Sequence, residues 1–304
     1  MRNKFSLAIY KNIKKNNKIF VIAADISPEG EMAKLQKTQK NFINVGVAEQ
    51  LMAGCAAGLA ASGFRPFIYT IATFAFYRPF EMIRDDICYQ NLPVTIVSMG
   101  AGTVYANLGG THTAIEDISI ARSLPNMKIL SPCDPLELEE CINYCCNKNN
   151  SPMYLRIGKS GEKIFTNSND TEKWKFGKIR KIKKGKGVCI IAHGPIVKIA
   201  FDLFKKKNLD FSIYSCHTLK PFDELGLQKI FNKYKKVIVL EDHSSIGGLS
   251  EIIRLRVNKF NFEGILKCMN LKDKFIHCFS SQKDLWKKHG ISENRLLSLI
   301  LSKR

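Results

Sequence analysis

The sequence contains no long apolar run, and this absence excludes a helix that spans a membrane. Such a helix needs roughly 18 or more consecutive apolar residues. Lysines interrupt the apolar residues throughout residues 1–20, so the N-terminus also lacks the apolar segment of a secretory signal. We therefore expect a soluble, cytoplasmic protein that does not act at a membrane.

The sequence also lacks the spacing patterns of a disulfide framework or a metal site. Its cysteines stand singly inside apolar segments, as at Cys55 and Cys189, which is typical of reduced core thiols. Cys141, Cys145 and Cys146 share one predicted helix, but no second Cys/His pair follows at the spacing of zinc ligands. The histidines form no HExxH pattern, so we expect no metal ligands in this chain.

Acidic residues are scarce, because 27 Asp and Glu stand against 47 Lys and Arg, for a formal net charge of +20. Such a charge suits a nucleic-acid-binding protein, since clustered lysines displace counterions from phosphates. The lysines are nevertheless spread along the chain, and only KIRKIKKGKG at 178–187 forms a dense run. We interpret that run as a solvated linker. Without a recognised nucleic-acid motif, we expect no nucleic-acid partner.

What is present is a pattern of alternating strands and helices. The chain has 304 residues and 45% apolar content, enough for about two domains. Residues 19–156 alternate short runs rich in Val and Ile with longer amphipathic runs, which predicts the order βαβαβαβαβ. Because parallel strands need crossover connections, we predict an α/β domain whose parallel sheet is covered by helices on both faces.

A polar stretch from 166 to 187 interrupts this pattern, and the pattern resumes after it. We therefore predict a first domain at 1–165, a linker at 166–187 and a second, smaller α/β domain at 188–304. Near the end of the chain the pattern predicts a strand at 275–279 and a polar helix close to 293–303.

Three segments of the first domain carry residues suited to chemistry. Glu49 begins an Ala/Gly-rich helix, where a carboxylate is also simply favourable beside the helix dipole. Residues 72–85 place four aromatics at a predicted strand-to-helix junction. Aromatics are usually core residues, but the carboxyl end of a parallel strand is also where open α/β sheets bind ligands. A platform that stacks on a ring is therefore one interpretation.

The third segment is the glycine-rich loop at 100–113. Gly100 and Gly102 start a GxG pattern, but Tyr105 stands where a dinucleotide loop needs its third glycine, so that reading fails. His112 lies in this loop, outside any regular apolar face. A histidine in that position is a candidate for proton transfer as well as for packing.

Taken together, the three segments resemble a known family. NVGVAEQ at 44–50, TFAFYRPFEMIRDD at 73–86 and GGTHTAIED at 109–117 are similar, in this order, to the pyrimidine-binding domain of transketolases and of 1-deoxy-D-xylulose-5-phosphate synthases. The resemblance continues through four later segments, at 124–142, 154–162, 218–223 and 239–251. It therefore covers nearly the whole chain and implies a pyrimidine-binding domain followed by a transketolase C-terminal domain.

The resemblance implies thiamine diphosphate as cofactor and assigns residues to it. Glu49 matches the glutamate that hydrogen-bonds the aminopyrimidine ring, and this contact favours the tautomer that generates the reactive ylid. Asp25 matches an acidic residue near the subunit interface. The aromatic segment matches the stretch that packs on the pyrimidine face, which makes cofactor-binding candidates of Phe74, Phe76 and Tyr77.

Two further residues are assigned to the substrate by the same resemblance. His112 matches the histidine that contacts substrate oxygens near the reacting carbon, so it is also a catalytic candidate. Arg156 matches an arginine that grips sugar phosphates, a task for which bidentate geometry is suited. The chain departs from the family pattern at Leu108, where transketolases have an aspartate, and at about Gly100, where they have a histidine.

The family's GDG…N segment, which binds magnesium and the diphosphate, does not occur in this sequence. A diphosphate needs such ligands because of its charge. We therefore expect Mg²⁺ to be held mainly by a separate N-terminal, diphosphate-binding subunit, in a heterotetramer with two copies of each subunit (α2β2). The implied function is the transfer of a two-carbon ketol unit from a ketose (phosphate) to an aldose, with this chain as the C-terminal subunit.

Three alternatives remain open from the sequence. The beta subunit of a 2-oxo-acid dehydrogenase shares the split architecture and domain order. A deoxyxylulose-phosphate-synthase-like enzyme shares the motifs, although that class is normally one long chain. A non-catalytic scaffolding paralogue is the alternative outside enzymes, and the presence of both Glu49 and His112 argues against it.

Overall fold

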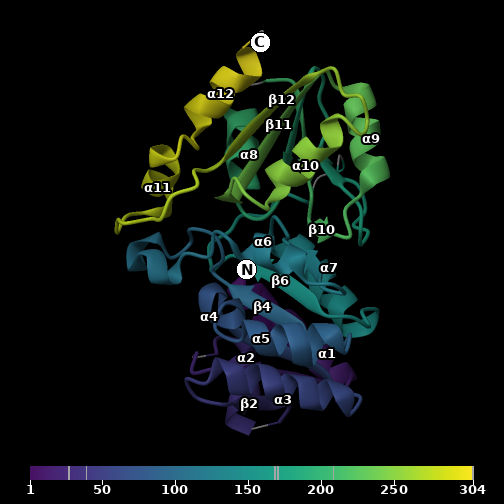
Figure 1. The fold of residues 1–304 in the computed structure, drawn as a ribbon, viewed down its shortest axis with the longest axis vertical. Coiled ribbons are helices and arrows are strands. Elements are labelled where there is room, and N and C mark those ends of the chain that lie inside the picture. Colours follow the sequence, from purple (N-terminus) through teal and green to yellow (C-terminus); the bar gives the residue numbers. More distant parts are fainter. Residues whose placement is uncertain (27, 39, 168, 170, 208, 303–304) are drawn as a thin grey trace.

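The computed structural model describes residues 1–26, 28–38, 40–167, 169, 171–207 and 209–302. Two sheets, each with helices packed on it, lie one above the other along the long axis of the molecule (Figure 1). The α/β fold class predicted from the sequence, with two mainly parallel sheets, is confirmed. Among the described residues, no helix is both long and apolar enough to cross a membrane.

The first sheet has seven strands in the order β10-β5-β6-β4-β3-β1-β2. Its strands from the first half of the chain run parallel, as buried strands linked by helices require. They are β1 (Ile19–Ala23), β2 (Phe42–Asn44), β3 (Arg65–Ile71), β4 (Thr95–Met99), β5 (Lys128–Leu130) and β6 (Met153–Ile157). The seventh, β10 (Thr218–Lys220), comes from the second half of the chain and pairs antiparallel with β5.

Helices cover both faces of this sheet. One face carries α1 (Arg2–Lys15), α2 (Glu31–Thr38) and α7 (Pro135–Asn147). The other carries α3 (Glu49–Ala61), α4 (Ala72–Phe76), the short α5 (Phe80–Met82), the π-helical turn η1 (Ile83–Tyr89) and α6 (Asp117–Ser123). Cys141, Cys145 and Cys146 are buried on α7 in the core between that helix and the sheet, so they pack as small apolar residues.

The second sheet has five strands in the order β12-β11-β8-β9-β7. Their bounds are β7 (Arg180–Lys183), β8 (Val188–Ala192), β9 (Phe211–Ser215), β11 (Lys236–Ser244) and β12 (Ile265–Leu271). The helices of this half are α8 (Val197–Lys207), α9 (Glu224–Lys233), α10 (Leu249–Val257), α11 (Gln282–Lys288) and α12 (Glu293–Leu301). One apolar core runs without interruption from the first sheet into the second, so the two halves pack as one body.

Two sequence predictions in this half are corrected by the structure. The run at 178–187 is not a solvated linker throughout, since β7 pairs antiparallel with β9 and buries Ile182 completely. Its alternating burial explains why: isoleucine faces the core while neighbouring lysines face outward, as in an edge strand. Residues 275–279 form no strand, because Phe275 and Phe279 are 82% and 79% exposed and β12 ends earlier.

Candidate active site

The carboxyl ends of the parallel strands bring the distant candidate residues to one edge of the first sheet. Glu49 follows β2, Phe74 follows β3 and His112 lies in the loop after β4. Arg78 Nη1 donates to Glu49 Oε1 at 2.7 Å, and the same guanidinium lies 4.0 Å from the centre of the Phe74 ring. The rings of Phe74 and His112 meet edge to face with centroids 5.2 Å apart. We call Glu49, Phe74, Arg78 and His112 the pyrimidine-edge cluster.

The sequence around Glu49 buries its carboxylate while leaving apolar neighbours exposed. Glu49 is 3% exposed at the start of α3, whose small residues let that helix pack closely. Val47 and Leu51 on either side are 71% and 55% exposed. A buried acid between two exposed apolar side chains is an arrangement that another molecule could cover.

Short 3₁₀ turns, η2 (Ala106–Leu108) and η3 (Gly110–His112), shape the loop that carries His112. The half-buried imidazole is held through Nδ1, which lies 2.9 Å from Thr111 Oγ1. Gly100 and Tyr105 are complementary, since a Cβ at position 100 would lie 2.1 Å from the Tyr105 ring. A side chain at position 100 would therefore overlap the Tyr105 ring.

The three predicted aromatic ligands have different surroundings. Phe74 is half-buried and borders His112. Phe76 is fully buried against Tyr154, with ring centroids 4.7 Å apart, so we assign it to the core and not to the cofactor surface. Tyr77 packs against the core and donates its hydroxyl to Glu116 Oε2 at 2.9 Å. Burial, reinforced by nearby carboxylates, raises the pKa of Tyr77, so its phenol stays protonated.

Arg156 does not lie at the surface of the chain, and its role in gripping a sugar phosphate stays a prediction. The side chain is 3% exposed, its Nε donates to Asp117 Oδ2 at 2.8 Å, and its Nη2 donates to the Asp242 carbonyl at 2.8 Å. Burial alone would lower the pKa of Arg156, but the carboxylates of Asp117 and Asp242 outweigh it and raise the pKa. Arg156 thus ties β6 to α6 and β11, within the molecule.

Asp25 lies at the carboxyl end of β1, on the same edge of the sheet as the cluster. Its backbone has a positive φ of 44°, and its amide donates to Asn44 Oδ1 at 3.1 Å. The Asp25 side chain is exposed. In the described part of the chain, no hydrogen bond or ion pair joins that side chain to the pyrimidine-edge cluster.

Two cations at this edge escaped the sequence prediction. Arg78 stands within the aromatic segment, four residues after Phe74, and that helical spacing is the signal that could have found it. Lys159 lies just beyond β6, and its Nζ is 4.8 Å from the centre of the Tyr105 ring. Tyr105 in turn lies 6.2 Å from His112 between ring centroids. Lys159 is half-exposed, whereas Arg156 is buried.

The cluster fits the aminopyrimidine end of thiamine diphosphate. Among the described residues, Arg78 alone hydrogen-bonds the Glu49 carboxylate, through Oε1, and this leaves Oε2 for a ring nitrogen. The half-buried Phe74 offers an aromatic edge beside it. For a metal ion, the described residues contain no group of three or more His, Cys, Asp or Glu side chains placed to bind one.

Comparisons with known proteins match these observations. The family profile described as the pyrimidine binding domain of transketolase matches residues 1–161, and the one described as the transketolase C-terminal domain matches residues 177–296. The chain is 28% identical to an apulose-4-phosphate transketolase subunit of Actinobacillus succinogenes, covering 92% of this chain and 91% of that protein. It is 32% identical to 1-deoxy-D-xylulose-5-phosphate synthase of Clostridium perfringens strain SM101, covering 90% of this chain but 44% of that protein.

The chain thus spans about half the length of the curated synthases that it matches. A solved structure described as a split gene transketolase, inactive beta4 tetramer, superposes with a TM-score of 0.84 at 29% identity, covering 98% of this chain and 96% of that one. Transketolase from Leishmania mexicana shares the fold, with a TM-score of 0.78 at 17% identity over 44% of its length. Sequence, fold and motifs agree, and the chain belongs to the transketolase family.

Proposed function

We propose that this chain is the pyrimidine-binding subunit of a split, thiamine-diphosphate-dependent transketolase. The observation that carries the proposal is the pyrimidine-edge cluster, which brings an acid, an aromatic ring and a histidine to one edge of the first sheet. The lengths of its relatives support it. The chain covers 91% of a protein named as a single subunit of a transketolase but only 43–48% of the synthases.

When bound, thiamine diphosphate supplies the nucleophilic carbon and the electron sink for cleaving a ketose next to its carbonyl. The residues of this chain position the cofactor and transfer protons. Glu49 would share a proton with the pyrimidine ring nitrogen through Oε2, and Phe74 would pack beside the ring. His112 stabilises the substrate oxygen on which charge develops, or transfers a proton to it, through the nitrogen that Thr111 does not hold.

A separate subunit completes the active site in this proposal. It holds the diphosphate and Mg²⁺, and it covers the exposed apolar residues beside Glu49. Two copies of each subunit form the α2β2 assembly. The solved relative described as an inactive beta4 tetramer is consistent with a chain of this kind being inactive without its partner.

In this proposal Lys159, and not Arg156, binds the phosphate of the substrate. Lys159 is half-exposed beside Tyr105, on the same edge of the sheet as His112. A lysine can hold the phosphate of a sugar as a point charge. Leu108, which is 43% exposed, replaces the aspartate of ordinary transketolases, so the donor sugar differs from the usual ketose phosphates at the hydroxyl which that aspartate recognises.

The test is ketol transfer by this chain mixed with its diphosphate-binding partner. Glu49→Gln keeps the shape of the side chain but removes its charge, and we expect at least about 100-fold lower kcat with unchanged assembly on size-exclusion chromatography. Glu81→Gln, an exposed glutamate on α5, is the matched control and should retain full activity. Near-normal transfer by Glu49→Gln contradicts the proposal.

A decarboxylating synthase of the deoxyxylulose type is the second candidate. The several relatives of this type at 30–32% identity favour it. The two reactions differ in their donor, because a synthase releases carbon dioxide from a 2-oxo acid whereas a transketolase cleaves a ketose. Measuring carbon dioxide release and ketose consumption in the same mixture separates them, and the absence of both supports the scaffolding alternative.

A further inference from the structure

A cavity of about 660 Å³ lies where the two halves of the molecule meet. Glu49, Phe74 and His112 are not among its lining residues, but Val104 of the loop after β4 and Lys159 are. Its walls come from residues 159–165 after β6, from α8 and α11, and from the start of α12. In Figure 1 this is the side of the second sheet that carries α11 and α12. The volume falls within the range of roughly 300–1,000 Å³ typical of small-molecule sites.

The charge lining this cavity is unbalanced. Six lysines face three carboxylates, at Glu162, Asp202 and Glu293. Each carboxylate already has a cation as partner: Glu162 pairs with the Met1 amine, Asp202 with Lys198, and Glu293 with Lys206. The acidic residues therefore leave the remaining lysines uncompensated.

Three of the remaining lysines form the positive side of the cavity. Among the described residues, no carboxylate lies within ion-pair distance of Lys163 or Lys283. Lys287 has only a long, exposed contact of 3.8 Å with Asp284, which contributes little. The fourth, Lys159, belongs to the proposed substrate edge as well and is not counted with these three. Uncompensated positive charge in a concave site concentrates anions.

The floor of the cavity is apolar. Phe165 and Ile291 are 3% and 1% exposed and belong to the core of the second half. Trp286 lines the cavity from α11, and its half-buried indole is the one aromatic side chain with exposed surface there. An apolar floor with a few convergent charged groups is the composition of a ligand site and not of a solvated groove.

The same tryptophan connects the cavity to the loop of the active site. Trp286 Nε1 donates to Asp242 Oδ1 at 2.9 Å, and Gln282, also in the wall, donates to Asp242 Oδ2 at 3.2 Å. The Asp242 carboxylate also accepts from the Thr103 amide at 3.0 Å and from the Thr103 hydroxyl at 2.8 Å. Thr103 belongs to the loop that leads to His112.

We infer that this cavity is a second ligand site, for a small polyanion with at least two phosphoryl groups. Three lysines around one cavity, two without a carboxylate partner among the described residues and one with only a long contact to Asp284, match the charge of such a group better than that of a single phosphate. A ligand that rests on Trp286 contacts the side chain that holds Asp242, and Asp242 holds the loop of His112. The site therefore couples occupancy by a phosphorylated metabolite to the position of that loop.

The experiment is calorimetric titration of the full chain alone with inorganic pyrophosphate, followed in parallel by tryptophan fluorescence. We expect a Kd below about 1 mM at about 0.15 M ionic strength, and at least about tenfold weaker binding of inorganic phosphate. The double variant Lys163→Met and Lys283→Met should weaken pyrophosphate binding by at least about tenfold.

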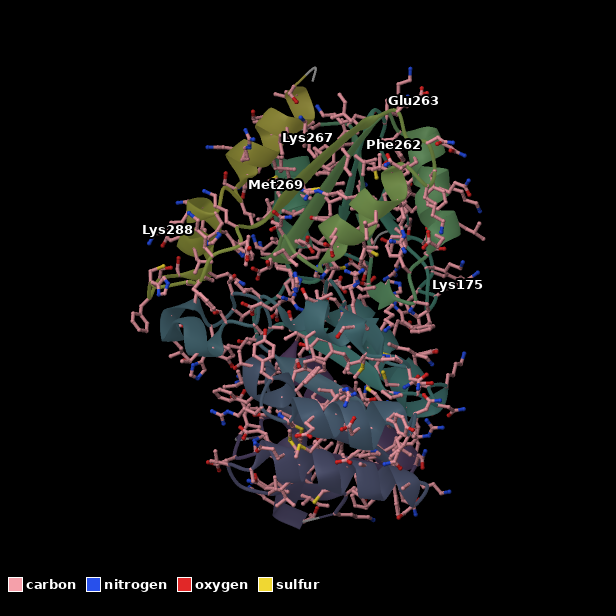
Figure 2. All side chains as sticks on the ribbon, in the orientation of Figure 1. Lys175, Phe262, Glu263, Lys267, Met269 and Lys288 are labelled. Carbon is pink, nitrogen blue, oxygen red and sulfur yellow. The ribbon has the colours of Figure 1, made fainter. Side chains whose placement is uncertain are left out.

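Lys288→Met is the matched control. Lys288, labelled in Figure 2, is the last residue of α11. It is exposed and is not among the residues that line the cavity, so its loss should leave the Kd unchanged. Trp286→Phe should abolish the fluorescence response while calorimetry still detects binding. Equal effects of Lys288→Met and the double variant mean diffuse charge attraction and overturn the proposal, as does the absence of binding. Neither result affects the proposed ketol transfer, which is assayed separately.

Discussion

Arg78 reaches across the pyrimidine-edge cluster to Glu49, with Nη1 2.7 Å from Oε1, and covers the Phe74 ring with the same guanidinium. Glu49 is almost fully buried and Arg78 is 45% exposed on its side chain. One flexible cation therefore orients both the acid and the aromatic ring that the proposed function assigns to the cofactor. This contact links the sheet-edge geometry directly to the expected chemistry.

Replacing Arg78 by Ala should loosen both groups at once. We expect thiamine diphosphate to bind the reconstituted complex about tenfold more weakly, because the orientation of the carboxylate is no longer fixed. Calorimetric titration of the cofactor measures this. Arg84→Ala is the matched control, since Arg84 is exposed and, among the described residues, its ion pair is with its neighbour Asp85. If Arg84→Ala weakens the binding of thiamine diphosphate as much as Arg78→Ala does, the positioning role of Arg78 is refuted.

Replacing Lys159 by Met should affect the substrate and not the cofactor. We expect KM for a phosphorylated sugar to rise about tenfold or more, with little change in the Kd of thiamine diphosphate. Steady-state kinetics with the phosphorylated and the unphosphorylated form of one sugar provides the comparison. If KM rises equally for the phosphorylated and the unphosphorylated sugar, Lys159 does not bind the phosphate.

Arg156→Met should reduce stability by about 3–5 kcal/mol, because it leaves the Asp117 carboxylate buried with its cation removed. Urea unfolding followed by circular dichroism measures the loss. The double variant Arg156→Met and Asp117→Asn should recover part of it, as expected for two directly paired groups. A folded, equally stable Arg156→Met protein with a raised KM for sugar phosphates would restore the role that the family resemblance implied.

Stability should fall as the pH drops below neutrality. Burial is the main cause that lowers the pKa of His217 and of His243 below the ordinary value of 6.5, although acidic neighbours oppose it. The unfolded chain then binds protons at both sites before the folded chain does, so stability is full above about pH 6.5 and is lost as pH falls through the lower folded pKa values. Melting curves from pH 8 to pH 5 should show this.

His243→Gln should flatten that pH dependence in part, since one of the two buried sites no longer titrates. His277→Gln, at an exposed position, should leave the profile as it is in the unmodified chain. A profile that His277→Gln alters and His243→Gln leaves intact would place the titration elsewhere.

The convergence of Glu49, Phe74 and His112 was predictable because all three follow parallel strands, whose carboxyl ends share one edge of a sheet. The burial of the Arg156 side chain could not be predicted from the sequence. The same arginine can grip a phosphate at the surface or pair inside the molecule, and the choice depends on Asp117 and on the Asp242 carbonyl, which only the folded chain brings near.

Local pattern also failed where pairing partners are distant. The sequence alone predicts a linker for the lysine-rich run that contains β7. In the fold this run is a strand, because β9 provides its hydrogen-bonding partners. The strand β10 belongs to the second half of the chain in sequence but extends the first sheet through β5. Phe74 and Phe76 are two residues apart, and the direction of α4 alone decides that one borders His112 while the other is buried against Tyr154.

The most direct test of the split-enzyme account is calorimetric titration of thiamine diphosphate, with Mg²⁺, into this chain alone and into its mixture with the diphosphate-binding subunit. The account predicts tight binding and ketol transfer in the mixture and no comparable binding by the chain alone, because this chain offers the pyrimidine contacts only. Equally tight binding by the chain alone, or no binding in the mixture, contradicts it.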